Sequence, residues 1–305
     1  MTISELLESV RRVEVRTNRL VNDTMVGAYL SHFKGRGMDF EELREYIPGD
    51  EVRDIDWNVT YRMGRPFVKR YREERELAMV LAVDVSASSA FGSLRRTKRQ
   101  FATEIAGTLA VSAARSSDKV ALLLFSDQVE LFLPPRKGRR HILRLIREML
   151  YFEPKHRGTN IPAALAFLNH VLHRRSIIFL LTDFLHSFGQ STVHGPGERD
   201  VIQEIGLTNV RHDVVCVHLH DPLEGVLPAA GLLTIEDAET GELLEVDSSR
   251  AAVREKFART NAERLAELDR ALRRAGVDTL RFSTAESFAQ MLQAFFETRH
   301  GRRRG

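Results

Sequence analysis

The sequence predicts an α/β protein with a doubly wound, mostly parallel sheet wrapped by helices. After residue 78, apolar runs of strand length alternate with helical patterns, which is typical of a parallel sheet with right-handed crossovers. The buried strands are expected at residues 79–85, 119–125, 176–181 and 214–219, with a last short strand at 280–282. Helices are expected at residues 94–115, 138–151 and 161–173.

Two parts of the pattern differ from this alternation. Residues 129–133 alternate between apolar and polar as an edge strand does, and Pro134-Pro135 is expected to end it. Residues 232–236 and 243–246 flank a turn and predict a β-hairpin inserted at 223–247. A polar loop over 186–198, a long charged helix over 248–275 that Gly276 ends, and a helix from Ser287 complete the expected elements.

Residues 1–77 form a separate segment in this interpretation. Residues 2–31 show helical spacing, and residues 32–77 mix acidic and basic side chains around a turn at Pro48-Gly49. We expect ion pairs to pack this segment against the main domain, residues 78–298. Gly35-Arg36-Gly37 is not read as a nucleotide loop, because no Gly-Lys-Ser/Thr follows it. Residues 299–305 are expected to be a basic, disordered tail.

The composition is that of a globular protein with one large domain and an appendage. Of 305 residues, 43% are hydrophobic and 29% charged, and the net charge of +3 calls for neither nucleic acid nor anionic lipid. The single cysteine, Cys216, excludes an internal disulfide and fits a reducing compartment. No apolar run reaches membrane-spanning length, and the N-terminus lacks a secretory pattern, so we expect a cytoplasmic protein.

The candidate site begins with three oxygen-bearing side chains at the end of the first buried strand. Asp84, Ser86 and Ser88 alternate along the chain, and residues two apart in an extended segment point the same way. Such a set suits a hard cation such as Mg²⁺, which prefers oxygen ligands in octahedral geometry. Taken alone, the stretch fits equally well a strand-to-helix turn in which these side chains cap backbone amides.

Two further residues favour the cation. Asp183 follows another buried strand, so it is expected at the same carboxyl edge of the sheet as Asp84. Thr159 stands at the start of a helix, where it is also a candidate N-cap. With Asp84, Ser86 and Ser88 they complete a set of five oxygens, which leaves one coordination position for a water or an incoming ligand.

The order of these residues resembles the metal-ion-dependent adhesion site of von Willebrand factor A-type domains. Five further segments resemble the signature of a bacterial family that carries such a Rossmann-like domain and is catalogued as domain of unknown function fifty-eight. They are FKGRG at 33–37, REYIPGD at 44–50, DIDWN at 54–58, GRPFVK at 64–69 and EER at 73–75. The resemblance covers roughly residues 20–220 and implies a von Willebrand factor A-type fold for the main domain.

The resemblance also implies a function. Members are typically encoded beside MoxR-type AAA+ ATPases, which implies a non-enzymatic adaptor or co-chaperone that acts with the ATPase in the maturation or remodelling of client proteins. It implies that Asp84, Ser86, Ser88, Thr159 and Asp183 bind Mg²⁺ or another divalent cation, some through water, and that a partner carboxylate completes the shell.

The sequence departs from the family in three respects. Phe184 replaces the glycine that is common after the second aspartate of adhesion-type domains, and Arg157-Gly158 replaces a pair of glycines before Thr159. Many members carry transmembrane helices, and no such segment is expected here.

Other functions remain as alternatives. The main one is a Mg²⁺-dependent phosphoester hydrolase using Asp84, although the site motifs contain no histidine or lysine to act as base or phosphate clamp. His218 and His220 share a strand face and suit zinc, but a pair is not a site. Cys216 is expected to be buried and inert. Nucleic-acid binding by the N-terminal segment is disfavoured, because acidic residues interleave its arginines.

Overall fold

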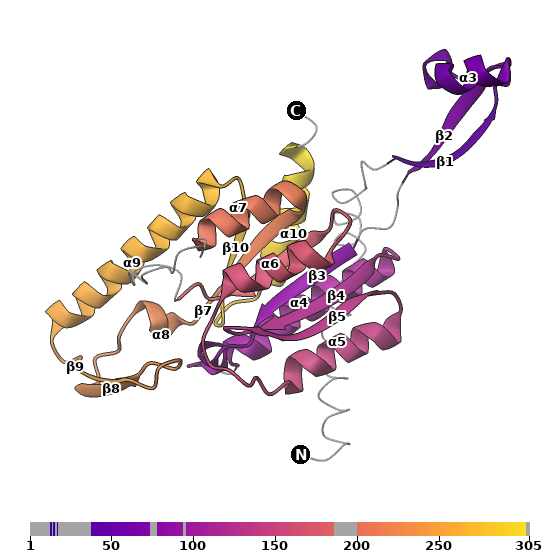
Figure 1. The fold of residues 1–305 in the computed structure, drawn as a ribbon. Helices are drawn as coiled ribbons and strands as arrows, with labels where there is room; N and C mark the ends of the chain where they lie inside the picture. The colour runs from indigo at the N-terminus through magenta and orange to yellow at the C-terminus, as the bar shows by residue number, and fades with distance from the viewer. Residues whose placement is uncertain are drawn as a thin grey trace. The chain divides into compact units, whose positions relative to one another are not determined.

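The computed structural model describes residues 38–73, 78–93, 96–185 and 200–302, together with Val13, Val15 and Thr17. The chain divides into two compact units (Figure 1). One comprises residues 33–77, and the other comprises residues 78–305 with residues 1–32. Of the segments predicted from the sequence, the loop 186–198 and all but three residues of the helix 2–31 lie outside the described residues.

The larger unit is built on a six-stranded sheet, which confirms the predicted α/β fold with a mostly parallel sheet. Its strands are β3 (Ala78–Asp84), β4 (Lys119–Phe125), β5 (Val129–Arg136), β6 (Ile177–Thr182), β7 (Asp213–His220) and β10 (Asp278–Ser283). Their order is β10-β7-β6-β3-β4-β5, and every neighbouring pair is parallel except β4 and β5. The central strands are buried on both faces, as continuous apolar runs require.

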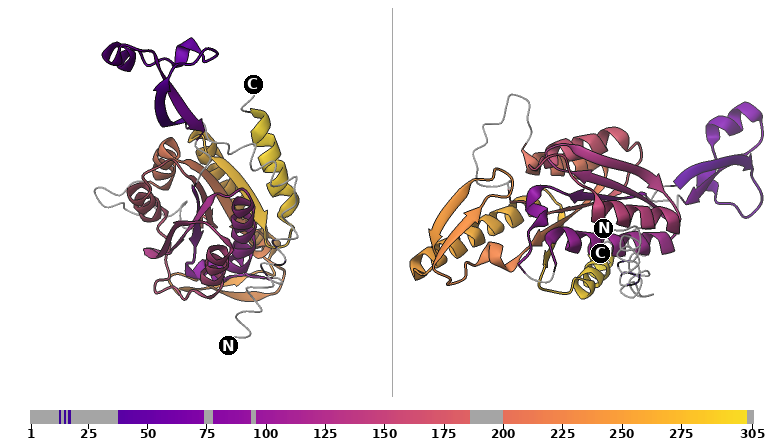
Figure 2. Two further views of the ribbon diagram at one scale, coloured as in Figure 1. Left: turned by 90° about the vertical axis from the view of Figure 1, so that its right-hand side faces the viewer. Right: turned by 90° about the horizontal axis from the view of Figure 1, so that it is seen from below.

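Helices cover both faces of this sheet (Figure 2). They are α4 (Lys98–Arg115), α5 (Arg139–Tyr151), α6 (Ile161–Val171), α7 (Val201–Arg211), α8 (Pro222–Gly225), α9 (Ala251–Arg274) and α10 (Ala289–Arg302). Helix α4 packs beside α5 on one face, and α6 packs beside α7 on the other. The arrangement is doubly wound: the chain leaves β3 toward the face covered by α4 and leaves its neighbour β6 toward the face covered by α7.

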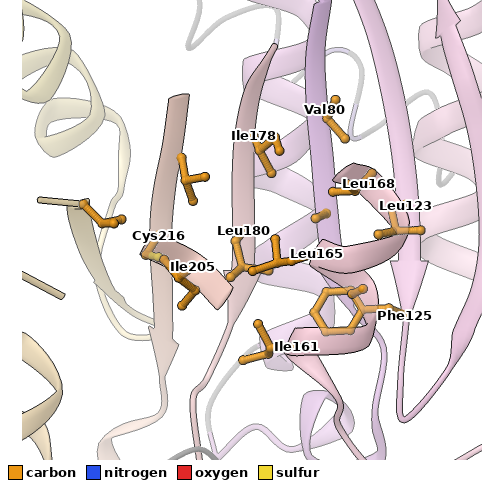
Figure 3. Packing of buried hydrophobic residues seen from close by; sticks show 14 of the residues in the cluster. Val80, Leu123, Phe125, Ile161, Leu165, Leu168, Ile178, Leu180, Ile205 and Cys216 are labelled. Atoms are coloured by element: carbon orange, nitrogen blue, oxygen red, sulfur yellow. The ribbon is translucent and has the colours of Figure 1, made fainter. Parts of the chain in front are cut away.

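The core on the α6 face shows why the sequence folds this way (Figure 3). Ile161, Leu165 and Leu168 recur at helical spacing on α6 and lie over Val80 and Leu180 of the sheet. All five side chains are at most 1% exposed. Full burial of an aliphatic side chain of this size contributes about 1.5–3 kcal/mol. On the opposite face, Phe101 of α4 makes edge contacts with Phe282 and Phe288.

The N-terminal part of the larger unit also contributes to burial. Thr17 is fully buried, and the methyl groups of Thr17 and Val13 lie beside Gly107 of α4. A β-carbon on Gly107 would come within 3.2 Å of Thr17, so a glycine allows this close approach.

Three elements differ from the prediction. Strand β5 continues through Pro134-Pro135 to Arg136, because it is an edge strand whose register shifts at the prolines, and an edge position needs no donor from them. Helix α7 was not predicted at all. Helix α10 extends to Arg302, and Arg299 pairs with Asp213 and Asp278, so order reaches into the segment expected as a tail.

The predicted hairpin is present as β8 (Leu232–Glu236) and β9 (Leu243–Asp247), which pair antiparallel. Its turn is held by Asp237, whose Oδ1 accepts hydrogen bonds from the amides of Glu239 and Thr240, both at 2.9 Å. Gly241 has a φ of +75°, a left-handed conformation that glycine adopts without strain. Most of the hairpin's side chains are exposed or half-buried.

The smaller unit is a second antiparallel pair, β1 (Met38–Glu45) with β2 (Phe67–Glu73), joined through a 3-10 turn, η1 (Val52–Asp54), and α3 (Trp57–Met63). Two ion pairs lie within the unit: Arg44 contacts Asp50 at 2.6 Å and Lys69 contacts Asp56 at 2.9 Å. The predicted turn at Pro48-Gly49 is present, with a φ of +113° at Gly49.

No helix among the described residues is long and apolar enough to cross a bilayer.

Cys216 provides a direct test of this core. Its side chain is fully buried on β7, and burial raises the pKa of its thiol, so little thiolate forms. We expect no reaction with a thiol-specific reagent under native conditions and stoichiometric reaction after denaturation, measured by absorbance. Rapid labelling of the native protein would contradict the buried position.

Candidate metal centre

The candidate site lies where the sheet changes its direction of winding. Strands β3 and β6 are neighbours, and the helices that follow them, α4 and α7, cover opposite faces of the sheet. The loops that leave the two strands therefore separate and open a crevice at their carboxyl ends, the usual place for a ligand in this architecture. Asp84 is the last residue of β3, and Asp183 directly follows β6.

The loop after β3 brings its two serines toward Asp183. The Oγ atoms of Ser86 and Ser88 lie 3.1 Å apart, and Ser88 Oγ donates to Asp183 Oδ2 at 2.8 Å. Asp84 Oδ1 accepts a hydrogen bond from the Ser86 amide at 2.9 Å. Ser86 stands at the N-cap of the 3-10 turn η2 (Ala87–Ala90), yet its side chain does not cap that turn. Asp84 therefore accepts a backbone amide, as the capping alternative predicts, but the hydroxyls of Ser86 and Ser88 do not cap the turn.

Thr159 completes the set from the other side of the crevice. Its hydroxyl does not cap α6, because Asn160 is the N-cap and accepts the amide of Ala163 at 3.0 Å. Thr159 Oγ1 instead lies 3.5 Å from Asp84 Oδ2. Backbone bonds fix this loop: the Ala87 amide donates to the carbonyl of Arg157 at 2.9 Å. The structure thus places all five predicted oxygen-bearing side chains around one crevice.

The spacing of these oxygens fits a small cation. Octahedral Mg²⁺ with ligands at 2.0–2.1 Å sets adjacent ligand oxygens about 3.0 Å apart. The separations along the set, between 2.8 and 3.5 Å, bracket this value. A separate cavity of about 10 Å³ is lined by Asp84, Asp183 and Lys98 but not by Ser86, Ser88 or Thr159, so it is not the space enclosed by the five candidate oxygens.

The chemistry of the donors also favours a hard ion. In the described part of the chain, no three His, Cys, Asp or Glu side chains gather as a metal-binding group. The candidate set instead combines two carboxylates with three hydroxyls, which suits Mg²⁺ better than zinc. The rings of His218 and His220, the pair predicted as a zinc alternative, lie 5.7 Å apart. Among the described residues, no third His, Cys, Asp or Glu side chain joins them to form a metal-binding group.

A lysine that the sequence did not point to reaches the site from the first turn of α4. Lys98 has a side chain only 2% exposed, and its Nζ donates to Asp183 Oδ2 at 2.5 Å and to the carboxylate of Glu224. It lies outside the site motifs, in a basic run from Arg95 to Arg99 that reads as a solvated surface. No signal in that run separates the buried lysine from its neighbours.

Burial and charge set the ionisation of the acidic groups. Burial, together with the charge of Asp183, raises the pKa of Asp84 to about 6. Burial acts in the same direction on Asp183, but the ammonium of Lys98 outweighs it and holds the pKa of Asp183 below its usual range. Burial also raises the pKa of Glu224, although Lys98 opposes it. Lys98 thus pairs with Asp183, whereas Asp84 is held by hydrogen bonds and has no ion-pair partner among the described residues.

Thr182 and Phe184, on either side of Asp183, are further parts of the site. Thr182 Oγ1 donates to Asp84 Oδ2 at 2.7 Å and so fixes that carboxylate. Phe184 adopts a φ of +53°, the left-handed region that a glycine would occupy without strain. Its ring is 1% exposed and contacts His218, so burial offsets the unfavourable backbone conformation. Packing therefore accommodates a phenylalanine at this position.

The fold defines an α/β protein with a mostly parallel sheet and a polar crevice at its carboxyl edge. The chain belongs to the family described as "Protein of unknown function DUF58", whose model matches residues 42–267. This confirms the family resemblance found in the sequence.

Two mycobacterial relatives match nearly the whole chain. The chain is 29% identical over 298 residues to Uncharacterized protein Rv1480 of Mycobacterium tuberculosis and to Uncharacterized protein Mb1516 of Mycobacterium bovis, covering 97% of this chain and 90% of each relative. Among solved structures, the conserved hypothetical protein BatB from Bacteroides thetaiotaomicron is 14% identical, with a TM-score of 0.43 over 74% of this chain and 98% of that chain. An aerotolerance-related membrane protein from Bacteroides fragilis is 13% identical, with a TM-score of 0.47 over 74% and 99%.

Removal of the buried ammonium tests the charge balance of the site. Lys98→Met leaves Asp183 and Glu224 buried without their cation, and breaking such a pair costs about 3–5 kcal/mol. We expect the free energy of unfolding in urea to fall by that amount. Lys155→Met, at an exposed position, is the control and should change it by less than about 0.5 kcal/mol. Equal stability of the two variants would contradict the ion pairs described above.

His218 makes stability depend on pH. Burial, reinforced by Arg281, lowers the pKa of His218 to about 3, against 6.5 for an ordinary histidine. Between these values the unfolded chain binds the proton and the folded chain does not, so stability falls as the pH is lowered. The contribution at pH 5 is about 2 kcal/mol. His218→Leu should reduce the loss of unfolding free energy between pH 7 and pH 5 by this amount. The same loss in the variant and in the wild type would refute the lowered pKa of His218.

Proposed function

We propose that this protein is a non-enzymatic, metal-dependent protein-binding module with a von Willebrand factor A-type site. Asp84, Ser86, Ser88, Thr159 and Asp183 would hold Mg²⁺, some of them through water, and a carboxylate of a partner protein would complete the shell. The observation that carries the proposal is the convergence of these five side chains from three loops on one crevice at the carboxyl ends of β3 and β6.

The electrostatics of the crevice support a cation. Asp84 and Asp183 are both at most 6% exposed and lie around one cavity. Lys98 supplies one positive charge, which is already shared between Asp183 and Glu224. Arg264 donates to the backbone carbonyls of Phe184 and Leu185, and its charge also acts on Asp183 and Glu224 but is not directed at Asp84. A divalent ion bound between Asp84 and the hydroxyls would offset the remaining negative charge, and it would attract a further carboxylate from outside.

A bound Mg²⁺ would supply electrostatic attraction for an anionic oxygen. The residues of this chain supply orientation: Thr182 and the Ser86 amide hold the two oxygens of Asp84, and Ser88 and Lys98 hold Oδ2 of Asp183. A site of this kind is preorganised for binding rather than for transfer of a group.

The partner follows from the family resemblance. We propose that the protein acts in the cytoplasm as an adaptor or co-chaperone of a MoxR-type AAA+ ATPase and that together they mature or remodel a client protein. The metal site would then bind a carboxylate of the ATPase or of the client.

The alternative is a Mg²⁺-dependent phosphoester hydrolase with Asp84 as nucleophile. Lys98 is the one observation in its favour, since a lysine near an aspartate can bind phosphate. However, its ammonium is held between two carboxylates and its side chain is 2% exposed. Both oxygens of Asp84 accept hydrogen bonds, and the residue is 4% exposed, which disfavours attack on a substrate.

Metal binding and partner binding can be measured separately. By isothermal titration calorimetry we expect one Mg²⁺ per chain, with binding lost in Asp84→Ala and retained in Asp54→Asn, an exposed carboxylate of the smaller unit. The same Asp84 variant should lose Mg²⁺-dependent binding to the MoxR-type ATPase encoded in the same genome. Binding of that ATPase equally well by Asp84→Ala in the presence of a chelator would contradict the proposal, and turnover of p-nitrophenyl phosphate lost in this variant would favour the hydrolase.

A further inference from the structure

A buried glutamate on the edge strand β5 contacts the loop that carries Thr159. Glu130 stands in an alternating stretch that predicts a solvent-facing side chain at its position, yet this side chain is only 3% exposed. Among the described residues no lysine or arginine pairs with it, and His156 Nδ1 lies 3.1 Å from its Oε1. A buried carboxylate is unfavourable unless it is hydrogen-bonded, so the partners of Glu130 indicate its role.

The Glu130 carboxylate binds two consecutive backbone amides of the loop before α6, residues 152–160. Its Oε1 accepts hydrogen bonds from the amides of Lys155 and His156, both at 3.1 Å, and from the hydroxyl of Ser126 at 2.8 Å. Burial acts to raise the pKa of Glu130, but these hydrogen bonds outweigh it and hold the pKa below its usual range. The group is therefore ionised at neutral pH, and an ionised acceptor binds amides more strongly than a neutral one.

The same loop is attached at two further points, and Thr159 lies between them. The carbonyl of Arg157 accepts the amide of Ala87, in the loop after β3, at 2.9 Å. The amide of Asn160 donates to the carbonyl of Ser126, at the end of β4, at 2.8 Å. The backbone on either side of Thr159 is therefore fixed to the two strand ends that border the crevice.

Of these three attachments, the one made by Glu130 is the only one that uses a side chain. Thr159 is also the only one of the five candidate ligands that this loop supplies. Mg²⁺ requires nearly ideal octahedral geometry, and a loop that must become ordered when the ion binds lowers the affinity by its entropy cost. Hydrogen bonds that hold the loop beforehand remove that cost.

We propose that Glu130 is a positioning residue of the metal site: it holds the loop at residues 155 and 156 so that Thr159 presents its hydroxyl before Mg²⁺ binds. This inference rests on the proposed function. It gives a role to β5, an edge strand that contributes no candidate ligand.

The test uses the full chain and Mg²⁺ alone. Glu130→Met removes the acceptor, Glu130→Gln keeps an oxygen within reach of both amides, and Glu153→Met is the control at an exposed carboxylate of the same loop. By calorimetry we expect Mg²⁺ to bind at least about tenfold more weakly to Glu130→Met than to the wild type. Glu130→Gln should recover most of this loss, and the control should bind as the wild type does.

Hydrogen–deuterium exchange separates positioning from a purely structural role. Without Mg²⁺, the amides of Lys155 and His156 should exchange faster in Glu130→Met than in the wild type, whereas the amides of β3, β4 and β6 should not. Saturating Mg²⁺ should slow exchange at these two amides in the variant, because the ion then orders the loop through Thr159. Faster exchange throughout the sheet, with no slowing by Mg²⁺, would show a purely structural role and overturn the proposal.

The two hypotheses fail differently. If Mg²⁺ binds neither the wild type nor any variant, the metal site is wrong and the role of Glu130 falls with it. If Mg²⁺ binds the wild type, is lost in Asp84→Ala and binds Glu130→Met as tightly as the wild type, the metal site stands and the positioning role is refuted. Equal losses in Glu130→Gln and Glu130→Met would also refute it, because charge rather than hydrogen-bond geometry would then set the affinity.

A further variant serves if Glu130→Met does not fold. Glu130→Asp keeps the charge and withdraws the acceptor by one methylene group, so it should weaken Mg²⁺ binding although the charge is unchanged. Wild-type affinity in Glu130→Asp would refute the proposal.

Discussion

The structure depends on the close approach of two buried carboxylates at one edge of the sheet. Parallel pairing of β3 with β6 aligns their carboxyl ends, so Asp84 and Asp183 come to the same crevice and are at most 6% exposed. Burial of two like charges is expensive unless each is neutralised or hydrogen-bonded. The surrounding elements all supply such partners: Thr182 from β6, Ser88 from the β3 loop and Lys98 from α4.

Lys98 shows how this constraint shapes the rest of the unit. A lysine in the first turn of a helix is not favoured by the helix dipole, and its burial removes an ammonium from water. Both costs are offset by its ion pairs with Asp183 and Glu224, the second of which joins α4 to the short helix α8. Because one ammonium is shared by two carboxylates, the crevice retains negative charge at Asp84. A cation bound beside Asp84 would neutralise this remaining negative charge.

Much of the fold and the whole set of candidate ligands could be predicted from the sequence. Continuous apolar runs define buried parallel strands, and parallel strands put their carboxyl ends together, so Asp84 and Asp183 could be joined without a structure. Lys98 and Glu224 could not, because their roles depend on tertiary contacts over 85 and 126 positions. Lys98 stands in a basic run whose composition is the same as that of an exposed surface segment.

The elements that the sequence missed have local causes. Pro134-Pro135 normally ends a strand, but β5 lies at an edge where the missing amides are not required. The segment before α7 is polar, and polar residues separate the apolar ones within the helix. The apolar stripe that would indicate a helix is therefore short. Phe184 adopts a glycine-like conformation that no local pattern indicates, since the burial that stabilises it comes from β7 and the core on the α6 face.

The most direct test of the central claim is an anomalous diffraction map from crystals soaked in Mn²⁺, a heavier substitute for Mg²⁺. The account predicts one peak in the crevice, within about 2.5 Å of an oxygen of Ser86, Ser88 or Thr159, with Asp84 and Asp183 around it. Absence of any peak there at saturating Mn²⁺, with Lys98 as the sole cation at Asp183, would contradict it.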